Sequence, residues 1–455
     1  MRPVLSAAVA ILLAGCMSPA STTDPAAVAW TQFGQGDDPP LIARVLIEDG
    51  ASCPAITIDG VTTTMPERRD SRAAMFGRMC EERRPLGQAM RIRIAYGNRV
   101  LLDQNVTRDP ATIAVLGDTG CRITSFYDQG CGDPSKWPFA QVADAAAARA
   151  PSLILHLGDY YYRETPCKGS SVDCVKAPYG DRPETWRAEF FAPARNLLPK
   201  APWVFVRGNH EDCMRGGYGW NYYFADGISH FRDGDKPAGR KSETCAQVSE
   251  ESIIRLAGLT LVNVDSAHAD DKYAARALNA KWKTIADSVV PRVEGTSGPV
   301  VVMTHDAAYT VCPEVCDKDE IANIGGLRAI GERLRAAGRR TLMLAGHIHV
   351  FQVLDGAAGL TEVIVGNGGA GLDKFPAVVP PPLNRNSFPD WRRTGADWKT
   401  IVSNGTVSAQ TQVWGAFGFA ILTPSTLELV MHDVGGRPQF TCTLAGARPD
   451  GPRCR

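Results

Sequence analysis

The chain has 455 residues, of which 44% are hydrophobic and 22% are charged, an ordinary balance for a globular protein long enough to hold more than one domain. Its 49 Lys and Arg residues equal its 49 Asp and Glu residues, so the formal net charge is zero. This balance gives no basic footprint for nucleic-acid binding and argues against a mainly electrostatic attachment to an acidic membrane.

The N-terminal segment has the features of an export signal. Arg2 is followed by an apolar run from Val4 to Leu13 and then by Ala14-Gly15-Cys16, which is a charged start, a short apolar core and small residues before a cleavage point. The run is shorter than the roughly 20 residues that span a bilayer. Because Leu-Ala-Gly-Cys resembles a bacterial lipoprotein box, we predict a signal peptide at 1–15, a lipid-modified Cys16 and a lipid-anchored tether at 16–40. An ordinary signal peptide with an incidental cysteine is the alternative.

The cysteine count agrees with an exported location, which we expect to be the bacterial periplasm or cell envelope. The chain has 13 cysteines, and setting Cys16 aside leaves an even number, as disulfide bonding in an oxidising compartment requires. Metal ligation by thiolates is the rival interpretation, and the lack of a Cys-x-x-Cys pair disfavours it. Connectivity does not follow from sequence, but pairing of neighbours would give Cys53/Cys80, Cys121/Cys131, Cys167/Cys174, Cys213/Cys245, Cys312/Cys316 and Cys442/Cys454.

Residues 41–109 are predicted to form a small all-β domain with no catalytic features. Residues Met90 to Ile94 alternate apolar and polar with period two, and Asp49-Gly50, Asp59-Gly60 and Gly97-Asn98 mark turns.

From Thr112 onwards, short apolar runs alternate with helical stretches, which predicts a second domain at 110–455 of the α/β class with buried sheets. Helices are expected at 139–149, 274–290 and 324–334, and the Pro-rich stretch 375–397 is expected to be a loop. The apolar runs, each predicted to be a buried strand, are 113–116, 153–157, 203–206, 259–264, 300–303 and 341–344.

Polar clusters follow five of these six runs. Because ligand sites in α/β sheets gather at the carboxyl ends of strands, the clusters should converge. Their carboxylate, phenol, amide and imidazole groups suit iron, manganese or zinc better than calcium. Each cluster alone is weak, but five in succession are a strong joint signal. The clusters are Gly117-Asp118-Thr119-Gly120, Gly158-Asp159-Tyr160-Tyr161-Tyr162, Gly208-Asn209-His210-Glu211, Thr304-His305 and Gly346-His347-Ile348-His349.

This succession resembles the signature of the metallophosphoesterases, the calcineurin-like superfamily. The first motif of that superfamily usually contains Asp-x-His, whereas this chain has Asp118 without the histidine and gains Tyr162 three residues after Asp159. That exchange, together with Val302-Met303-Thr304-His305, resembles the purple acid phosphatases. The resemblance covers about residues 112–371 and implies a four-layer α/β/β/α sandwich after the small N-terminal β domain.

The resemblance also implies a dinuclear metal centre. One ion, of the Fe(III) type, would be held by Asp118, Asp159, Tyr162 and His349. The other, a divalent Fe, Zn or Mn ion, would be held by Asp159, Asn209, His305 and His347, with Asp159 bridging. Such a pair would hydrolyse a phosphomonoester through in-line attack by a metal-bound hydroxide.

Further residues are candidates for contact with the substrate or the leaving group. His210 is expected to face the phosphate or leaving group as the catalytic proton donor, or else to orient a metal ligand. Arg207 and Asn209 are candidates for substrate contact, with a structural ion pair as the alternative for Arg207. The family's further histidine after the Val-x-x-His element is absent, so the leaving group would be served by Asp306, Tyr309, His230 or His268.

Several alternatives remain open from sequence. A phosphodiesterase, nucleotidase or pyrophosphatase would share the same metal core, and a non-catalytic phosphate-binding surface lipoprotein is a more distant possibility. The Gly366-Asn367-Gly368-Gly369-Ala370-Gly371 stretch matches a dinucleotide-binding pattern, but prolines follow where a helix is required, so that interpretation is rejected. The expected partner is a small phosphate ester, with membrane contact only through the lipid anchor, and the oligomeric state is left open.

Overall fold

The computed structural model describes residues 27–47, 50–69, 73–124, 127–169, 172–226, 249, 251–268, 275–309, 325–355, 360–373, 412–444 and 452–455. The predicted signal peptide, Cys16, the loop at 375–397, Cys245, Cys312, Cys316 and His230 lie outside these residues. Within them the chain forms three β-sheets of ten, seven and four strands.

The ten-stranded sheet has the order β21-β20-β19-β18-β8-β9-β10-β1-β2-β5. Its centre is parallel, since β8 pairs with β9, β9 with β10 and β10 with β1, all in the same direction. The strands are β1 (Val28–Phe33), β2 (Pro40–Ile47), β5 (Arg78–Pro85), β8 (Ile113–Leu116), β9 (Leu153–His156), β10 (Trp203–Phe205), β18 (Gly418–Thr423), β19 (Glu428–Asp433), β20 (Pro438–Thr443) and β21 (Arg453–Cys454).

The seven-stranded sheet has the order β11-β12-β13-β14-β16-β15-β17. Strands β12, β13, β14 and β16 are parallel neighbours, and their runs of Val, Leu and Met are buried on both faces, as parallel sheets require. The strands are β11 (Ser252–Leu256), β12 (Leu259–Asn263), β13 (Val300–Met303), β14 (Thr341–Ala345), β15 (Phe351–Asp355), β16 (Thr361–Val365) and β17 (Gln412–Trp414).

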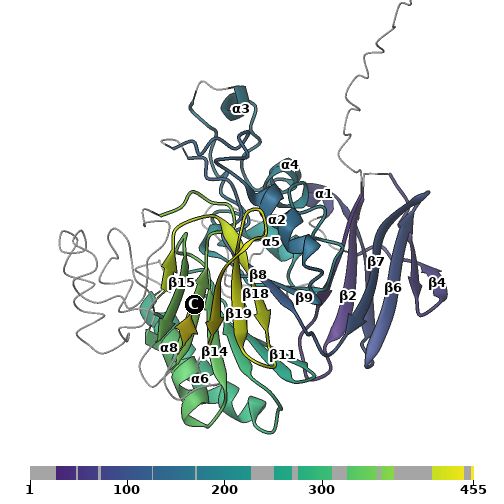
Figure 1. Cartoon of the computed structure of the whole chain (residues 1–455). Coiled ribbons are helices and arrows are strands. Elements are labelled where there is room, and N and C mark those ends of the chain that lie inside the picture. Colours follow the sequence, from purple (N-terminus) through teal and green to yellow (C-terminus); the bar gives the residue numbers. More distant parts are fainter. Residues whose placement is uncertain are drawn as a thin grey trace, which may run out of the picture.

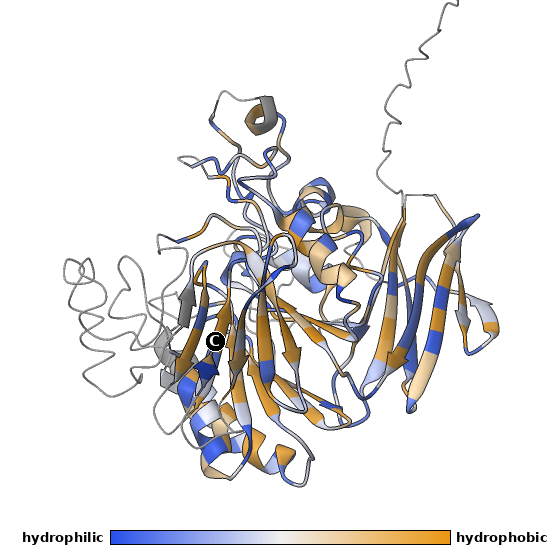
Figure 2. Cartoon of the chain, in the orientation of Figure 1, coloured by the Kyte–Doolittle hydropathy of each residue, from blue (hydrophilic) through white to orange (hydrophobic). Residues whose placement is uncertain are grey.

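The two large sheets pack face to face with helices outside them, which confirms the predicted four-layer sandwich (Figure 1). Apolar side chains of both sheets, such as Val115 and Val301, share one core between the layers. A second core lies under α2 (Phe139–Ala148), α5 (Gly217–Tyr223) and the π-helix η1 (Arg187–Phe191). A third lies under α6 (Ala275–Val293) and α8 (Gly325–Ala336). Figure 2 shows the strands of the sandwich as predominantly hydrophobic.

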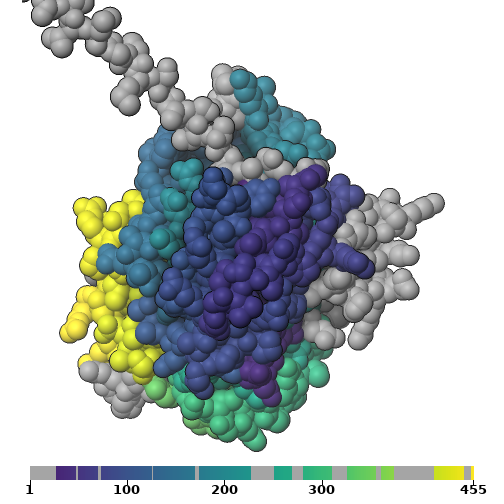
Figure 3. All heavy atoms as spheres, turned by 90° about the vertical axis from the view of Figure 1, so that its right-hand side faces the viewer, coloured from purple at the N-terminus to yellow at the C-terminus, as the bar shows by residue number. Residues whose placement is uncertain are grey.

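The remaining sheet, with the order β4-β3-β6-β7, forms the purple and dark-blue face of the molecule in Figure 3. It comprises β3 (Ala55–Ile58), β4 (Val61–Thr64), β6 (Ala89–Tyr96) and β7 (Arg99–Thr107), with the short α1 (Ala73–Phe76) nearby in sequence. Alternate residues of β6 are buried, as its period-two pattern predicts.

The division of the N-terminal region differs from the prediction. Residues 28–33 are not tether but the fully buried β1, and β2 and β5 extend the large sheet rather than belonging to a separate domain. The polar side chains of β1 are satisfied inside the protein: Thr31 donates to Gln104 Oε1 at 2.6 Å and Gln32 donates to the Phe224 carbonyl at 2.8 Å. This region is therefore integral to the sandwich.

Four disulfide bonds join the cysteine pairs expected from sequence proximity: Cys53–Cys80, Cys121–Cys131, Cys167–Cys174 and Cys442–Cys454. Cys213 is disulfide-bonded as well. In the described part of the chain, no helix has both the length and the apolar character needed to cross a bilayer.

Candidate metal centre

The predicted ligands all follow the carboxyl ends of central strands. Asp118 follows β8, Asp159 and Tyr162 follow β9, and Asn209 begins the short 3-10 helix η2 (Asn209–Glu211) after β10. On the facing sheet, His305 follows β13, and His347 and His349 follow β14. The two sheets thus bring both sets of side chains to one end of the sandwich.

Three of these residues have a strained backbone conformation, and a glycine allows two of the loops to approach closely. Asp118, Asp159 and His347 have φ angles of 54°, 57° and 69°, a left-handed conformation that is uncommon outside glycine. A Cβ on Gly208 would lie 2.1 Å from Asp159 Oδ1, so only glycine fits before Asn209. Such strain gathers at functional sites because the surrounding structure holds it in place.

Tyr162 stands at the centre of the first half of the site. Its hydroxyl lies 2.7 Å from Asp159 Oδ2, 3.1 Å from Asp118 Oδ1 and 2.9 Å from His349 Nε2. Burial, followed by the two carboxylates, raises the pKa of Tyr162 well above its ordinary value. One oxygen or nitrogen from each of Asp118, Asp159 and His349 lies within 4.8 Å of the others, a spacing that can hold a metal ion.

His305 and Asn209 make the second half. His305 Nε2 lies 3.0 Å from Asn209 Oδ1 and 3.3 Å from Asp159 Oδ2, so Asp159 faces both halves. The His347 ring lies 5.2 Å from that of His305, centroid to centroid. His347 also donates its backbone N–H to both oxygens of Asp118, at 3.1 and 3.0 Å.

The donor set fits two cations. The Nδ1 atoms of His305 and His349 lie 2.8 and 2.7 Å from the carbonyls of Leu157 and Gly371, an arrangement that leaves each Nε2 directed at the site as a ligand. The described residues provide no Lys or Arg ion pair for the buried Asp118 or Asp159, whose charged neighbours are histidines. Burial opposes a charge on His305, yet Asp159 raises its pKa to about 10, so the site favours positive charge.

Comparison with known proteins identifies the family. The profile described as calcineurin-like phosphoesterase matches residues 111–351, more than half of the chain. The chain belongs to the calcineurin-like phosphoesterase family. It is accordingly a hydrolase of phosphate esters, from a family that uses a dinuclear metal centre.

Solved structures share the fold of this phosphoesterase at low sequence identity. A purple acid phosphatase, PPD1 from yellow lupin (Lupinus luteus) seeds, is 12% identical with a TM-score of 0.52, and the match covers 91% of this chain and 74% of that one. PhoD is 9% identical with a TM-score of 0.53, and the match covers 94% of this chain and 91% of that one. A search of the curated proteins found no match.

Two buried glutamates brace the ligand loops of the phosphoesterase. Glu211 accepts hydrogen bonds from the backbone N–H groups of Gly208, Asp159, Tyr160 and Tyr161, at 2.9 to 3.1 Å. Glu189 accepts from the N–H groups of Cys121 and Tyr162 and lies 2.5 Å from Arg163. In the sequence, Glu189 is marked only as a lone carboxylate beside Phe190 and Phe191, so its role was not predicted.

His210 lies beside the predicted ligands and has Glu164, a residue not predicted from the sequence, as its partner. Its ring lies over Tyr162 at 4.1 Å, its backbone N–H donates to Asp159 Oδ1, and its Nε2 is 4.0 Å from Asp159 Oδ2. Its Nδ1 is 2.5 Å from Glu164 Oε1. This contact fixes the ring orientation, and Glu164 is therefore a candidate positioning residue.

Arg207 and Tyr309, two candidates for contact with the substrate, are buried in contacts with other side chains. For Arg207 the structure shows the structural ion pair that was the alternative to substrate contact. Its side chain is 1% exposed, lies 3.3 Å from Asp265, donates to the Glu211 carbonyl and covers the Trp220 ring. Tyr309 is also buried and donates to Glu332, away from the ligands. Asp306 does approach the site, with Oδ1 4.0 Å from His347 Nε2.

The glycine-rich stretch supports the first ligand loop. Gly368 donates its N–H to the Gly117 carbonyl at 3.0 Å, and Ala370 donates to the Asp118 carbonyl at 2.8 Å. A Cβ on Gly368 would lie 2.4 Å from Gly117 O, which explains the glycine there without a dinucleotide.

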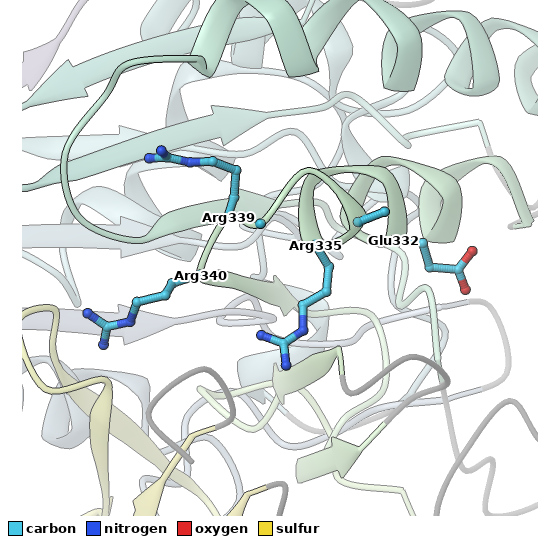
Figure 4. A pocket seen from close by; sticks show the side chains of 6 residues that line it. Glu332, Arg335, Arg339 and Arg340 are labelled. Atoms are coloured by element: carbon cyan, nitrogen blue, oxygen red, sulfur yellow. The ribbon is translucent and has the colours of Figure 1, made fainter. Parts of the chain in front are cut away.

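A surface cavity of about 440 Å³ lies at the N-terminal end of β14, whereas two of the predicted ligands follow its C-terminal end (Figure 4). It is lined by the C-terminal turn of α8 and the loop before β14, including Arg335, Arg339 and Arg340. His347 and His349 follow the opposite end of β14, so this cavity is not the metal centre.

Proposed function

We propose that the chain is an exported phosphomonoesterase of the purple-acid-phosphatase type. The observation that carries the proposal is the buried Tyr162 hydroxyl between Asp118 and Asp159, with His349 as its third neighbour. A phenol at this position, in place of the usual histidine of the first motif, is what the sequence shares with the purple acid phosphatases.

The residues divide into two ligand sets. Asp118, Asp159, Tyr162 and His349 suit a hard trivalent ion, because they offer carboxylate and phenolate oxygens. The second set, Asp159 with Asn209, His305 and His347, is softer and suits a divalent Fe, Zn or Mn ion. When bound, two such ions neutralise the phosphate and lower the pKa of a water for in-line attack on phosphorus.

The chain's own side chains complete the reaction. His210, whose ring is held by Glu164, would give a proton to the departing oxygen. Asn209 would contact the phosphate as well as an ion. No side chain is needed as a nucleophile, so no phosphoenzyme is expected.

Iron in the first position has a test that does not depend on turnover. Aerobically purified protein should show a visible tyrosinate-to-iron absorption band, and Tyr162→Phe should abolish it while the metal content of the second position is retained. A colourless protein with full zinc occupancy and full activity would overturn the iron assignment.

Export and lipid anchoring are supported by the leader-like N-terminus and by the disulfide bonds, which persist in oxidising compartments. Radioactive palmitate should label the protein expressed in a bacterial host. Cys16→Ala should remove the label.

The phosphomonoesterase assignment is tested by comparing the rates at which a chromogenic phosphomonoester and the matching diester are hydrolysed. The Asn209→Ala variant serves as the inactive control. A faster monoester rate that disappears in Asn209→Ala supports the proposal. A diester preference would keep the metal centre but assign a phosphodiesterase. If neither ester is cleaved after reconstitution with iron, manganese and zinc, the catalytic proposal fails.

A further inference from the structure

Loops after β8 and β9 meet beside the metal centre. Ile123 forms a bridge with Asp128 in its own loop and with Arg163 in the loop after Tyr162. Gly180 donates its N–H to the Arg163 carbonyl at 2.8 Å, which folds the second loop back onto the site. Figure 1 shows this second loop, which carries α3 (Val172–Val175), projecting beyond the ends of the strands.

These loops are braced by disulfide bonds and yet expose large apolar side chains. Tyr127 lies inside the Cys121–Cys131 ring, and Val175 and Met214 directly follow the bonded Cys174 and Cys213. Of the seven large hydrophobic side chains exposed among the described residues, four lie on the loops after β8, β9 and β10, namely Tyr127, Val175, Tyr179 and Met214. Apolar groups held rigidly at the edge of a polar site indicate a recognition surface.

Tyr127 is the member of this set whose position next to the ligands is fixed. The buried Gln129 donates to the Gly369 carbonyl and accepts from Gly371 N–H, and this anchors the loop to the glycine-rich stretch. The Tyr127 hydroxyl lies 2.9 Å from the point where a Cβ on Gly371 would be. The Gly371 carbonyl is the partner of His349 Nδ1, so one residue separates the tyrosine from a metal ligand.

A bound ester can extend its leaving group toward these loops, where the described side chains are exposed. The groups behind the ligands, such as Thr119 and His156, are completely buried and hydrogen-bonded to each other at 2.9 Å. Tyr127 is 48% exposed and has the Arg122 guanidinium 5.9 Å from its ring centroid. Tyr179 is paired with Arg182 in the same way, at 5.7 Å. Exposed aromatic rings backed by arginine are a platform for stacking of planar rings.

The geometry points to Tyr127 as a specificity-determining residue that stacks on a planar aromatic ring in the leaving group of the phosphomonoester. The substrate class is thus an aromatic or heteroaromatic phosphate ester rather than a simple sugar or glycerol phosphate. This inference rests on the proposed phosphomonoesterase function, because it places the phosphate at the metal centre.

The test compares adenosine 5′-monophosphate with ribose 5-phosphate. Both release a ribose 5-hydroxyl, and they differ at the anomeric carbon, which carries adenine in the nucleotide and a hydroxyl in ribose 5-phosphate. The wild-type protein should turn over the nucleotide with a kcat/KM about tenfold higher, mainly through KM, because one stacked ring contributes about that factor. Tyr127→Ala should lower the value for the nucleotide to that for ribose 5-phosphate, and Tyr127→Phe should behave as wild type.

Two controls separate this inference from the proposed function. Val61→Ala, at a 68% exposed position on β4, should leave both substrates unaffected. Binding of the two non-hydrolysable methylene phosphonate analogues, measured by calorimetry, gives a readout that does not need turnover. A Tyr127-dependent preference for the nucleoside phosphonate supports the inference even if no ester is cleaved. If the two analogues bind equally, the two substrates are turned over equally and Tyr127→Ala changes neither result, the inference is overturned while the phosphatase assignment stays intact.

Discussion

Glu211 offers the sharpest stability test of the ligand loops. Its two oxygens accept four backbone hydrogen bonds: Oε1 from Tyr160 and Tyr161, and Oε2 from Asp159 and Gly208. The side chain is completely buried, so water cannot replace it. Each buried donor left without a partner costs about 1–3 kcal/mol. Glu211→Ala, which leaves four, should therefore lower the free energy of unfolding by at least about 4 kcal/mol, a large part of the ~5–15 kcal/mol typical of a domain.

Glu211→Gln separates the hydrogen bonds from the volume of the side chain. Whichever oxygen becomes the amide, two of the four donors lose their acceptor. Burial and then the nearby Asp159 raise the pKa of Glu211, and removal of that repulsion partly offsets the loss, so we expect the lower end of the range, about 2 kcal/mol. Urea unfolding of metal-free protein measures both variants, with the exposed Glu294→Gln as the matched control. A Glu211→Ala protein as stable as wild type would refute the bracing role.

Three further predictions concern Glu164, Arg44 and Glu362. Glu164→Ala should lower kcat about tenfold with little change in KM, because the ring of His210 loses its orienting partner; a pure KM effect would contradict this role. Arg44→Met should lower the free energy of unfolding by about 3 kcal/mol, since the buried guanidinium donates to two carbonyls at the end of α5; the half-exposed Arg84→Met should change it little in the same urea assay. Burial raises the pKa of Glu362 to about 8 in the folded protein, so the carboxyl group loses its proton at a lower pH in the unfolded chain than in the folded one. The contribution of Glu362 to the free energy of unfolding should therefore fall as pH rises from about 4.5 to about 8. Glu362→Gln should remove that slope from unfolding curves measured across the range, and an unchanged slope would contradict the assignment.

The central strands were predictable because their chemistry is local. Runs such as Ile113–Leu116 and Val300–Met303 are apolar throughout and end in a polar cluster, which marks both a buried strand and its carboxyl end. β1 was missed because Thr31 and Gln32 make Val28–Phe33 look like a polar tether. The partners that bury them, Gln104 and the Phe224 carbonyl, lie 73 and 192 residues away.

Within the site too, local sequence patterns were predictable, whereas contacts between residues distant in sequence were not. The predicted ligands could be picked out because each sits in a short motif whose composition and order carry the information. Glu189 and Glu164 were not found, since their roles depend on contacts with Tyr162 and His210, 27 and 46 residues away. For Arg207 the sequence left substrate contact and a structural ion pair open, because a position two residues before Asn209 does not fix the direction of the side chain. The buried contact with Asp265 decides for the ion pair.

The central claim is that hydrolysis requires two metal ions held by these two ligand sets. Metal-free protein titrated with a single divalent metal, with bound metal per chain and phosphomonoester hydrolysis recorded together, tests it most directly. Activity should appear only as the second ion binds, and His305→Ala, which removes a ligand of one position, should stop at one ion per chain without turnover. Full activity in the metal-free protein, or at one ion per chain, would contradict the account.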